Sequence, residues 1–139
     1  MTIALDFDGV IHSYHKGWQK GEIYGYPIDG ALESIHTLLR QGHSVVIIST
    51  RSPFQIRNWL DMLNAAPAPE IIPFEYQVIP FWKKFWNKKN VVGITRRKIV
   101  ANIYIDDRAE RFDGNWLVTM NHIKGFKTWQ EIEKRKGPY

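Results

Sequence analysis

The sequence predicts an α/β fold, a three-layer sandwich built on a mainly parallel sheet. Short apolar runs suited to strands alternate with helical patterns along the chain. Residues 45–48 read Val-Val-Ile-Ile, the pattern of a strand buried on both faces. Polar residues follow three of the apolar runs, at the edge where parallel α/β sheets place their functional crevice. We therefore expect helices on both faces of the sheet and a single domain over residues 1–139.

The first part of the chain predicts a strand, an irregular segment and a helix. Residues 2–7 are compatible with a strand, and Asp8-Gly9 is a turn signal. Residues 10–26 mix glycine, aromatic and basic residues without a period, which favours an irregular flap or hairpin. Apolar residues then recur every three or four positions over residues 28–41, which predicts a helix that stops before Gly42.

A second strand and helix come next. We expect the strand over residues 44–48. Ser52, Pro53 and Gln55 fit the N-cap, the first helical position and the reciprocal capping position of a helix. Ile56, Trp59, Leu60 and Leu63 form its apolar stripe. Residues 65–73 contain three prolines and are expected to form a loop.

The C-terminal half has weaker signals. Residues 74–90 are aromatic and basic, and their pattern supports no assignment. Residues 91–94 suggest a short strand, and residues 99–105 form an apolar run that leads into Asp106 and Asp107. We predict a last strand over residues 116–118 and a short helix over residues 128–136.

Composition bounds the kind of protein. The chain has no cysteine, which excludes disulfides and thiolate metal sites and favours a reducing compartment. No run approaches the roughly 20 apolar residues of a membrane span, and the first residues do not resemble a signal peptide. We expect a cytoplasmic protein without membrane contact. The sequence does not predict its oligomeric state.

Positive charge is concentrated in one segment. Residues 82–98 hold seven of the 19 basic residues and no acidic residue, so the rest of the chain has 12 basic against 14 acidic residues. Such a segment attracts phosphate-bearing partners, nucleic acid included. A solvated basic loop is an equally good interpretation. Phe81, Trp82, Phe85 and Trp86 interleave with its lysines, as in single-strand binding sites, although we favour an amphipathic helix with core aromatics.

Paired aspartates stand at the ends of two predicted strands. Asp6 and Asp8 lie two apart on an extended chain, so both can point to one side. Asp106 and Asp107 follow a separate run. Carboxylates that converge repel one another unless a cation is present, and oxygen ligands of this kind suit Mg²⁺. Capping and turn roles would explain a single aspartate but explain these pairs poorly.

Four motifs in order resemble those of the haloacid dehalogenase superfamily. They are Asp6-Phe7-Asp8-Gly9-Val10, then Ser49 after its apolar strand, then Lys98, and finally Ile103-Tyr104-Ile105-Asp106-Asp107. Together they cover roughly residues 2–112. Val10 stands where many members have threonine. The segment from Lys98 to Ala109 also resembles small bacterial and phage-associated members, and some relatives act on phosphorylated nucleic-acid ends.

The resemblance implies a role for each motif residue. Asp6 would be the nucleophile that takes up a phosphoryl group, and Asp8 the general acid and base. Gly9 would leave room for the phosphate, Ser49 would donate a hydrogen bond to it, and Lys98 would neutralise its charge, with Arg97 as the reserve. The resemblance implies that Asp6, Asp106 and the main-chain carbonyl of Asp8 hold Mg²⁺, with Asp107 as a further candidate ligand.

Two further residues are candidates for substrate binding. Thr50 and Arg51 follow Ser49 at the end of the second strand. Arg51 could grip a phosphate bidentately, or it could form a salt bridge with a nearby carboxylate, and the sequence favours neither. We expect His12 and His15 to be surface or substrate-facing residues of the flap.

The expected function is Mg²⁺-dependent phosphomonoester hydrolysis. The segments between predicted elements are too short for a typical cap domain, so we expect a Rossmann-like, haloacid-dehalogenase-like domain with an open site. Phosphorylated nucleotides or nucleic-acid ends are the leading substrates. A phosphatase of small metabolites, or a non-catalytic module that binds nucleic acid or protein, are the alternatives.

Overall fold

The computed structural model describes residues 1–65 and 74–135. The chain divides into two compact units, residues 1–105 and 106–139. The single domain expected over residues 1–139 therefore stays a prediction. The proline-rich loop predicted over residues 65–73 lies, from residue 66 on, outside the described residues.

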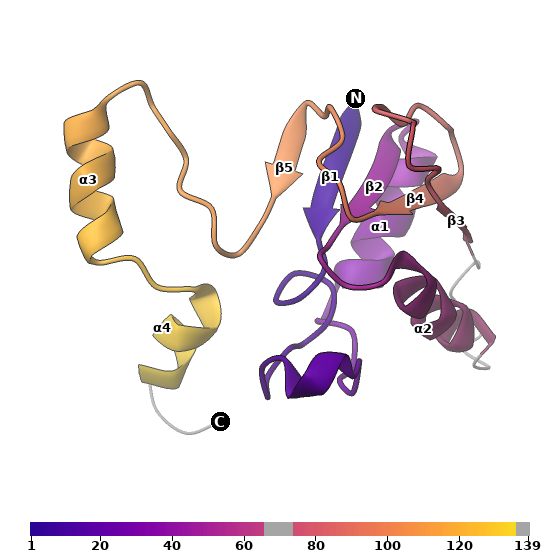
Figure 1. Ribbon diagram of the computed structural model, residues 1–139, viewed down its shortest axis with the longest axis horizontal. Helices are drawn as coiled ribbons and strands as arrows, with labels where there is room; N and C mark the ends of the chain where they lie inside the picture. The colour runs from indigo at the N-terminus through magenta and orange to yellow at the C-terminus, as the bar shows by residue number, and fades with distance from the viewer. Residues whose placement is uncertain (66–73, 136–139) are drawn as a thin grey trace. The chain divides into compact units, whose positions relative to one another are not determined.

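The first unit is built on a five-stranded parallel sheet of order β3-β4-β2-β1-β5. The strands are β1 (Thr2–Asp6), β2 (Ser44–Ile48), β3 (Glu75–Val78), β4 (Val91–Thr95) and β5 (Ile103–Ile105). In Figure 1, β1 and β5 lie side by side with arrowheads pointing the same way. The α/β class with a parallel, Rossmann-like sheet is therefore confirmed.

Two helices pack on one face of this sheet. They are α1 (Ala31–Arg40) and α2 (Pro53–Ala65). Leu32, Ile35 and Leu39 of α1 share a core with Ile56 and Leu60 of α2; from the strands this core receives Ile3, Leu5, Val45, Ile47, Val92 and Ile94. The alternating positions of β1 and β2 thus bury one set of side chains under the helices.

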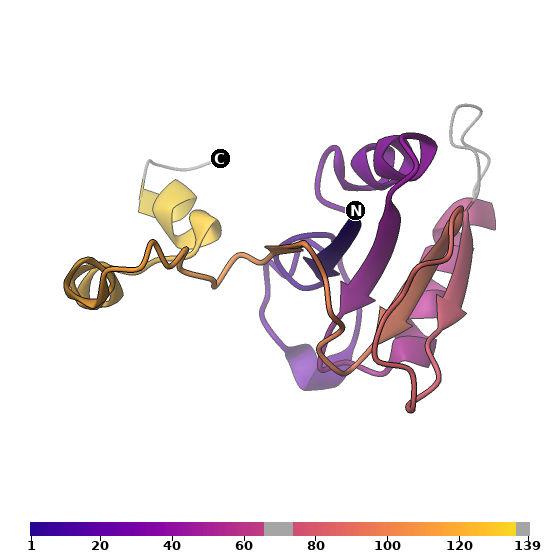
Figure 2. The same ribbon diagram turned by 90° about the horizontal axis from the view of Figure 1, so that it is seen from above.

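The opposite face of the sheet is covered by the irregular stretches on either side of β4, residues 79–90 and 96–101. Ile79, Trp86 and Ile99 pack there against Ala4 and Val46. Trp86 lies so close to β4 that a Cβ on Gly93 would come within 2.8 Å of its ring. In Figure 2, α1 and the turn after β3 lie on opposite sides of the strands. In this unit an irregular segment therefore supplies the layer that a helix was expected to supply.

The segment between β1 and α1 is the irregular flap that the sequence predicts. It contains one short 3₁₀ turn, η1 (Gln19–Gly21), and isolated bridges that join His12 to Asp8 and to Pro27. The helix after it starts three residues later than expected, because Gly30 adopts a left-handed conformation with φ 84°. Its C-terminal end matches the prediction, with Gly42 also left-handed at φ 85°.

The second unit contains helices α3 (Trp116–Lys124) and α4 (Trp129–Arg135). The strand predicted over residues 116–118 is wrong. Asn115 caps α3 by accepting hydrogen bonds from the backbone N–H groups of Leu117 and Val118. α4 confirms the predicted short helix, and Thr128 and Glu131 cap it reciprocally; residue 136 lies beyond the described part. None of the described helices is long and apolar enough to cross a membrane.

Two strand predictions also differ from the structure. β3 lies in the segment that received no assignment, and β5 occupies only the last three residues of the apolar run 99–105. β3 reads Glu-Tyr-Gln-Val, and it is a strand because each of its residues pairs with β4. Such pairing is a long-range property that a four-residue pattern does not predict.

Candidate metal and phosphate site

Three carboxylates gather at the carboxyl ends of β1 and β5. Leu5 pairs with Ile105, so Asp6 and Asp106 are the next residue on each of two neighbouring strands. Asp6, Asp106 and Asp107 each offer a carboxylate oxygen, and these oxygens lie within 4.8 Å of one another. Unscreened carboxylates at this separation repel. An all-oxygen donor set of this kind fits a hard cation such as Mg²⁺.

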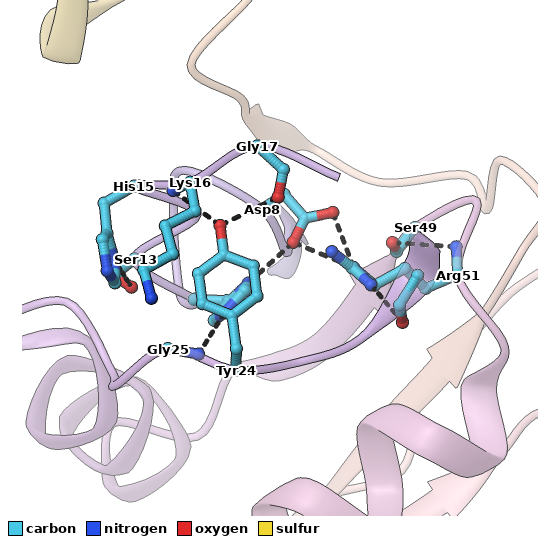
Figure 3. Close-up of polar contacts among 11 residues, drawn as sticks. Asp8, Ser13, His15, Lys16, Gly17, Tyr24, Gly25, Ser49 and Arg51 are labelled. Carbon is cyan, nitrogen blue, oxygen red and sulfur yellow. Dashed lines mark hydrogen bonds and ion pairs between the residues drawn. The ribbon is translucent and has the colours of Figure 1, made fainter. Parts of the chain in front are cut away.

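The Asp8 carboxylate belongs to a second cluster rather than to this triad. Arg51 Nε donates to both Asp8 oxygens, at 2.8 Å to Oδ2 and 3.0 Å to Oδ1. Figure 3 shows the two side chains facing each other. The Arg51 side chain is completely buried, whereas that of Asp8 is 18% exposed. The salt-bridge interpretation of Arg51 is therefore confirmed, and a substrate role for Arg51 stays a prediction.

His12 is the second partner of Asp8. Its Nδ1 lies 2.9 Å from Asp8 Oδ1, and its Nε2 accepts a hydrogen bond from the Gly25 N–H at 3.0 Å. A ring nitrogen that accepts an N–H carries no proton, so in the neutral ring Nδ1 holds the hydrogen and donates it to Asp8. The ring is fully buried and stacks on Phe7. The expectation that His12 is a surface or substrate-facing residue is wrong.

Arg51 also ties the flap to the site. Its Nη1 donates to the Gly21 carbonyl at 2.7 Å, and its guanidinium lies 4.5 Å from the centre of the Trp18 ring. The buried Nη2 has no hydrogen-bond partner among the residues that the structure describes. A guanidinium of this kind retains one donor group for an anion.

Ser49 and Thr50 end β2 beside this arginine. The Ser49 hydroxyl is buried and accepts a hydrogen bond from the backbone N–H of Arg51 at 3.2 Å. Its own N–H donates to the Thr95 carbonyl at the end of β4. The hydroxyl hydrogen of Ser49 is left to donate elsewhere. Thr50 is exposed.

The side chains of the three basic residues after β4 contact different parts of the first unit. Lys98 Nζ lies 4.8 Å from the centre of the Tyr104 ring on β5, which brings this lysine toward the strand that precedes Asp106. Arg97 Nη2 donates to the Pro80 carbonyl, and Arg96 Nε donates to the Arg51 carbonyl. Lys98 is thus the residue directed toward β5, while Arg97 is directed toward the segment after β3.

Tyr24 closes the flap on itself. Its hydroxyl accepts from the Lys16 N–H at 2.7 Å and donates to the Gly17 carbonyl at 2.8 Å (Figure 3). Burial raises the pKa of the Tyr24 phenol above its ordinary value, so the phenol remains a donor throughout the neutral range. His15 is held by a contact between its Nδ1 and the Ser13 hydroxyl.

Exposure of the aromatic segment differs from our expectation. Residues 81–86 form no helix, and of their four aromatic side chains only Trp86 is core, at 1% exposed. Phe81 and Trp82 are 75% and 69% exposed. The interpretation as an amphipathic helix with core aromatics is therefore wrong for this segment, apart from Trp86.

His12 is the residue that sequence reasoning missed. A weak signal was present, because His12 follows Asp8 by four residues across the turn at Gly9, where the backbone reverses at φ 79°. The turn brings the Gly9 N–H to the His12 carbonyl at 2.9 Å. Its burial depends on Phe7, Tyr24 and Trp59, all of which contact the ring.

Fold and site together define an α/β protein with a parallel sheet and an acidic cluster able to hold a metal ion. No family model matches the chain, and no curated protein matches it. Among solved structures, the chain is similar to a conserved protein from Bacteroides thetaiotaomicron, at 23% identity and a TM-score of 0.48. The match covers 95% of this chain and 96% of that one. At these values the likeness carries no argument about activity.

Proposed function

We propose that the protein is a Mg²⁺-dependent phosphomonoesterase in which Asp6 is the nucleophile. The observation that carries the proposal is the grouping of Asp6, Asp106 and Asp107 at the carboxyl ends of two adjacent strands. The ordered motifs that resemble the haloacid dehalogenase superfamily support it. Asp6, Asp106 and Asp107 would hold Mg²⁺, which when bound offsets the repulsion between the carboxylates and a phosphate.

The reaction would proceed in two displacements at phosphorus. An Asp6 oxygen forms a bond to phosphorus as the bond to the ester oxygen breaks, and Asp8 gives its proton to the departing alkoxide. In the second step water attacks the aspartyl-phosphate, Asp8 takes a proton from that water, and the Asp6 carboxylate and inorganic phosphate are released. Asp8 thus returns to its starting state.

The partners of Asp8 suit the second step, in which Asp8 takes a proton from water. Oδ1 receives the His12 and Arg51 hydrogens, whereas Oδ2 receives only Arg51 Nε among the residues the structure describes. Oδ2 therefore keeps a lone pair for the proton that moves to and from the substrate. Arg51 and His12 hold the carboxylate in one orientation, which lowers the cost of aligning it.

Three donors are available for the phosphoryl oxygens. The Ser49 hydroxyl hydrogen, the Lys98 ammonium and the Arg51 Nη2 group would stabilise charge that develops on the transferred group. Gly9 is left-handed and buried, and it brings the backbone of the first motif close to this region without a side chain. Thr50 would line the same edge.

Release of inorganic phosphate tests the proposal. Purified protein with Mg²⁺ is assayed against an aryl phosphate, nucleoside monophosphates, sugar phosphates and end-phosphorylated oligonucleotides. We expect turnover that a chelator abolishes, and a loss of about a thousandfold or more in Asp6→Asn. Asp61→Asn, at an exposed position of α2, is the matched control and should keep full activity. Folded protein without turnover on any substrate would refute the proposal and favour a binding module.

A further inference from the structure

We infer that the substrate is the phosphorylated end of a single-stranded nucleic acid, and that Phe81 and Trp82 form a base-stacking platform beside the site. The inference rests on the proposed function and adds a substrate class to it. Phe81 and Trp82 together are called the platform. Its exposure, its position and the charge around it support the assignment.

Exposure sets the platform apart from the other aromatics of its segment. The side chains of Phe81 and Trp82 are 75% and 69% exposed, although large aromatic side chains are usually buried. Their ring centres lie 5.3 Å apart with an interplanar angle of 85°. An edge-to-face pair of this kind leaves ring faces open to solvent, and an open ring face is what a nucleobase stacks on.

The platform lies at the same edge of the sheet as the acidic cluster. It comes after β3, whose last residue Val78 pairs with Ile94 near the carboxyl end of β4. Pro80, directly before the platform, accepts a hydrogen bond from Arg97 Nη2, and the Arg97 N–H donates to Thr95 Oγ1. The Thr95 carbonyl in turn accepts from the Ser49 N–H. A continuous series of contacts thus joins the platform to the phosphate site.

The separation between the strands favours a substrate longer than one nucleotide. In the sheet order, β3 lies three strands from β1, which corresponds to ~14 Å at the usual strand spacing. A phosphate held beside Asp6 at β1 therefore belongs to a different part of the ligand from the base that stacks at β3. An oligonucleotide is long enough to contact both the phosphate site and the platform, whereas a sugar phosphate is not.

Charge favours nucleic acid over a protein partner. Residues 82–98 contain seven basic and no acidic side chains, and Arg96, Arg97 and Lys98 are all exposed between the platform and β5. Aromatic faces combined with cations are the composition of sites that bind single strands. Not all the positive charge belongs to this surface, because Lys89 reaches the Gly42 carbonyl and Ser44 at the amino end of β2.

The residues on the C-terminal side of the platform anchor it to the sheet. Trp86 is buried against Gly93, its Nε1 donates to the Val91 carbonyl, and Lys83 N–H donates to the Pro80 carbonyl. A segment anchored in this way loses little conformational freedom when a ligand binds.

A length series tests the inference by kinetics. The probes are a terminally phosphorylated oligothymidylate of about six residues, its mononucleotide, and an aryl phosphate. We expect kcat/KM for the oligonucleotide to exceed that for the mononucleotide. Phe81→Ala and Trp82→Ala should each raise KM for the oligonucleotide about tenfold, and they should leave turnover of the aryl phosphate unchanged. Phe85→Ala is the matched control, since Phe85 is 57% exposed but pairs with Val100 away from this edge.

Binding gives a readout that does not need turnover. Fluorescence anisotropy of the labelled oligonucleotide is measured against salt concentration with Asp6→Asn protein. Arg97→Ala should remove one phosphate contact and so decrease the magnitude of the slope of log affinity against log salt by about one. Lys89→Ala should leave this slope unchanged. Each variant removes one positive charge, so the two variants have equal net charge. A difference between them therefore reports the position of the lost charge.

The outcomes separate the inference from the proposed function. Equal kcat/KM for oligonucleotide and mononucleotide, with no effect of the platform variants, would overturn the inference while phosphatase activity stands. Absence of turnover on every probe would refute the phosphatase, and absence of oligonucleotide binding as well would overturn the platform. Concentration-dependent dimers that dissociate in Trp82→Ala would assign the platform to contact between two copies of the chain instead.

Discussion

His12 Nδ1 lies 2.9 Å from Asp8 Oδ1, and the backbone N–H of Gly25 fixes the tautomer by donating to the other ring nitrogen. A histidine of the flap thereby orients the residue proposed to move the proton. The flap and the proposed catalytic edge are coupled through this ring and through Arg51, which binds both Asp8 and the Gly21 carbonyl.

The first prediction concerns this ring. His12→Leu removes the donor to Asp8, and we expect kcat to fall ten- to a hundredfold with KM little changed, because misaligned acid–base groups lose rate rather than binding. His12→Asn places an amide N–H near the position of Nδ1 and should restore part of kcat. Steady-state kinetics across pH would show a changed profile in the leucine variant. An unchanged kcat and profile would leave His12 a packing residue.

Arg51 should be important for stability as well as for the site. Arg51→Met leaves the Asp8 carboxylate partly buried without its main partner, and we expect a loss of about 3–5 kcal/mol in the free energy of unfolding. Combining it with Asp8→Asn should cost less than the two single changes added together. Urea denaturation measures both values. Arg40→Met on exposed α1 surface is the control, with an effect within about 0.5 kcal/mol.

Divalent cation should stabilise the folded protein. At Mg²⁺ concentrations about a hundredfold above Kd, the unfolding free energy should rise by about 2.7 kcal/mol in the wild type. Asp106→Asn should remove most of this gain, because it takes one carboxylate from the triad. Asp61→Asn should keep the full gain. A thermal shift series with Mg²⁺ distinguishes these cases, and equal shifts in all three proteins would place the cation elsewhere.

Alkaline pH should destabilise the protein through Tyr76. Burial raises the pKa of the Tyr76 phenol well above its ordinary value of 10.0, with Asp61 adding a smaller contribution. Above that ordinary value the unfolded chain releases a proton that the folded chain keeps, so the unfolding free energy decreases as pH rises. The expected slope from this residue is about 1.4 kcal/mol per pH unit.

Tyr76→Phe should remove this component of the slope. Tyr26→Phe, at a largely exposed position, is the comparison and should retain the wild-type slope. Because lysines titrate in the same range, the informative quantity is the difference between the two variants. Identical slopes for both would contradict the assignment to Tyr76.

The elements whose signals are local could be predicted from the sequence alone. The apolar run of β2, the Ser-Pro start of α2 and the spacing in α1 each depend on neighbouring residues, and the structure has them within three residues of the prediction. The positions of Asp6 and Asp106 at strand ends were equally predictable, since parallel strands bring their carboxyl ends to one edge.

Which partners the polar and aromatic side chains have depends on the tertiary structure. Asp8 meets Arg51 across 43 positions of the chain, and Phe81 and Trp82 are exposed while Trp86 is buried. Trp86 fits because Gly93, on a strand formed by long-range pairing, leaves space for its ring. Local patterns cannot encode such contacts, because burial and ion pairing depend on which distant segments pack together. For the same reason the four residues of β3 did not predict that this strand pairs with β4.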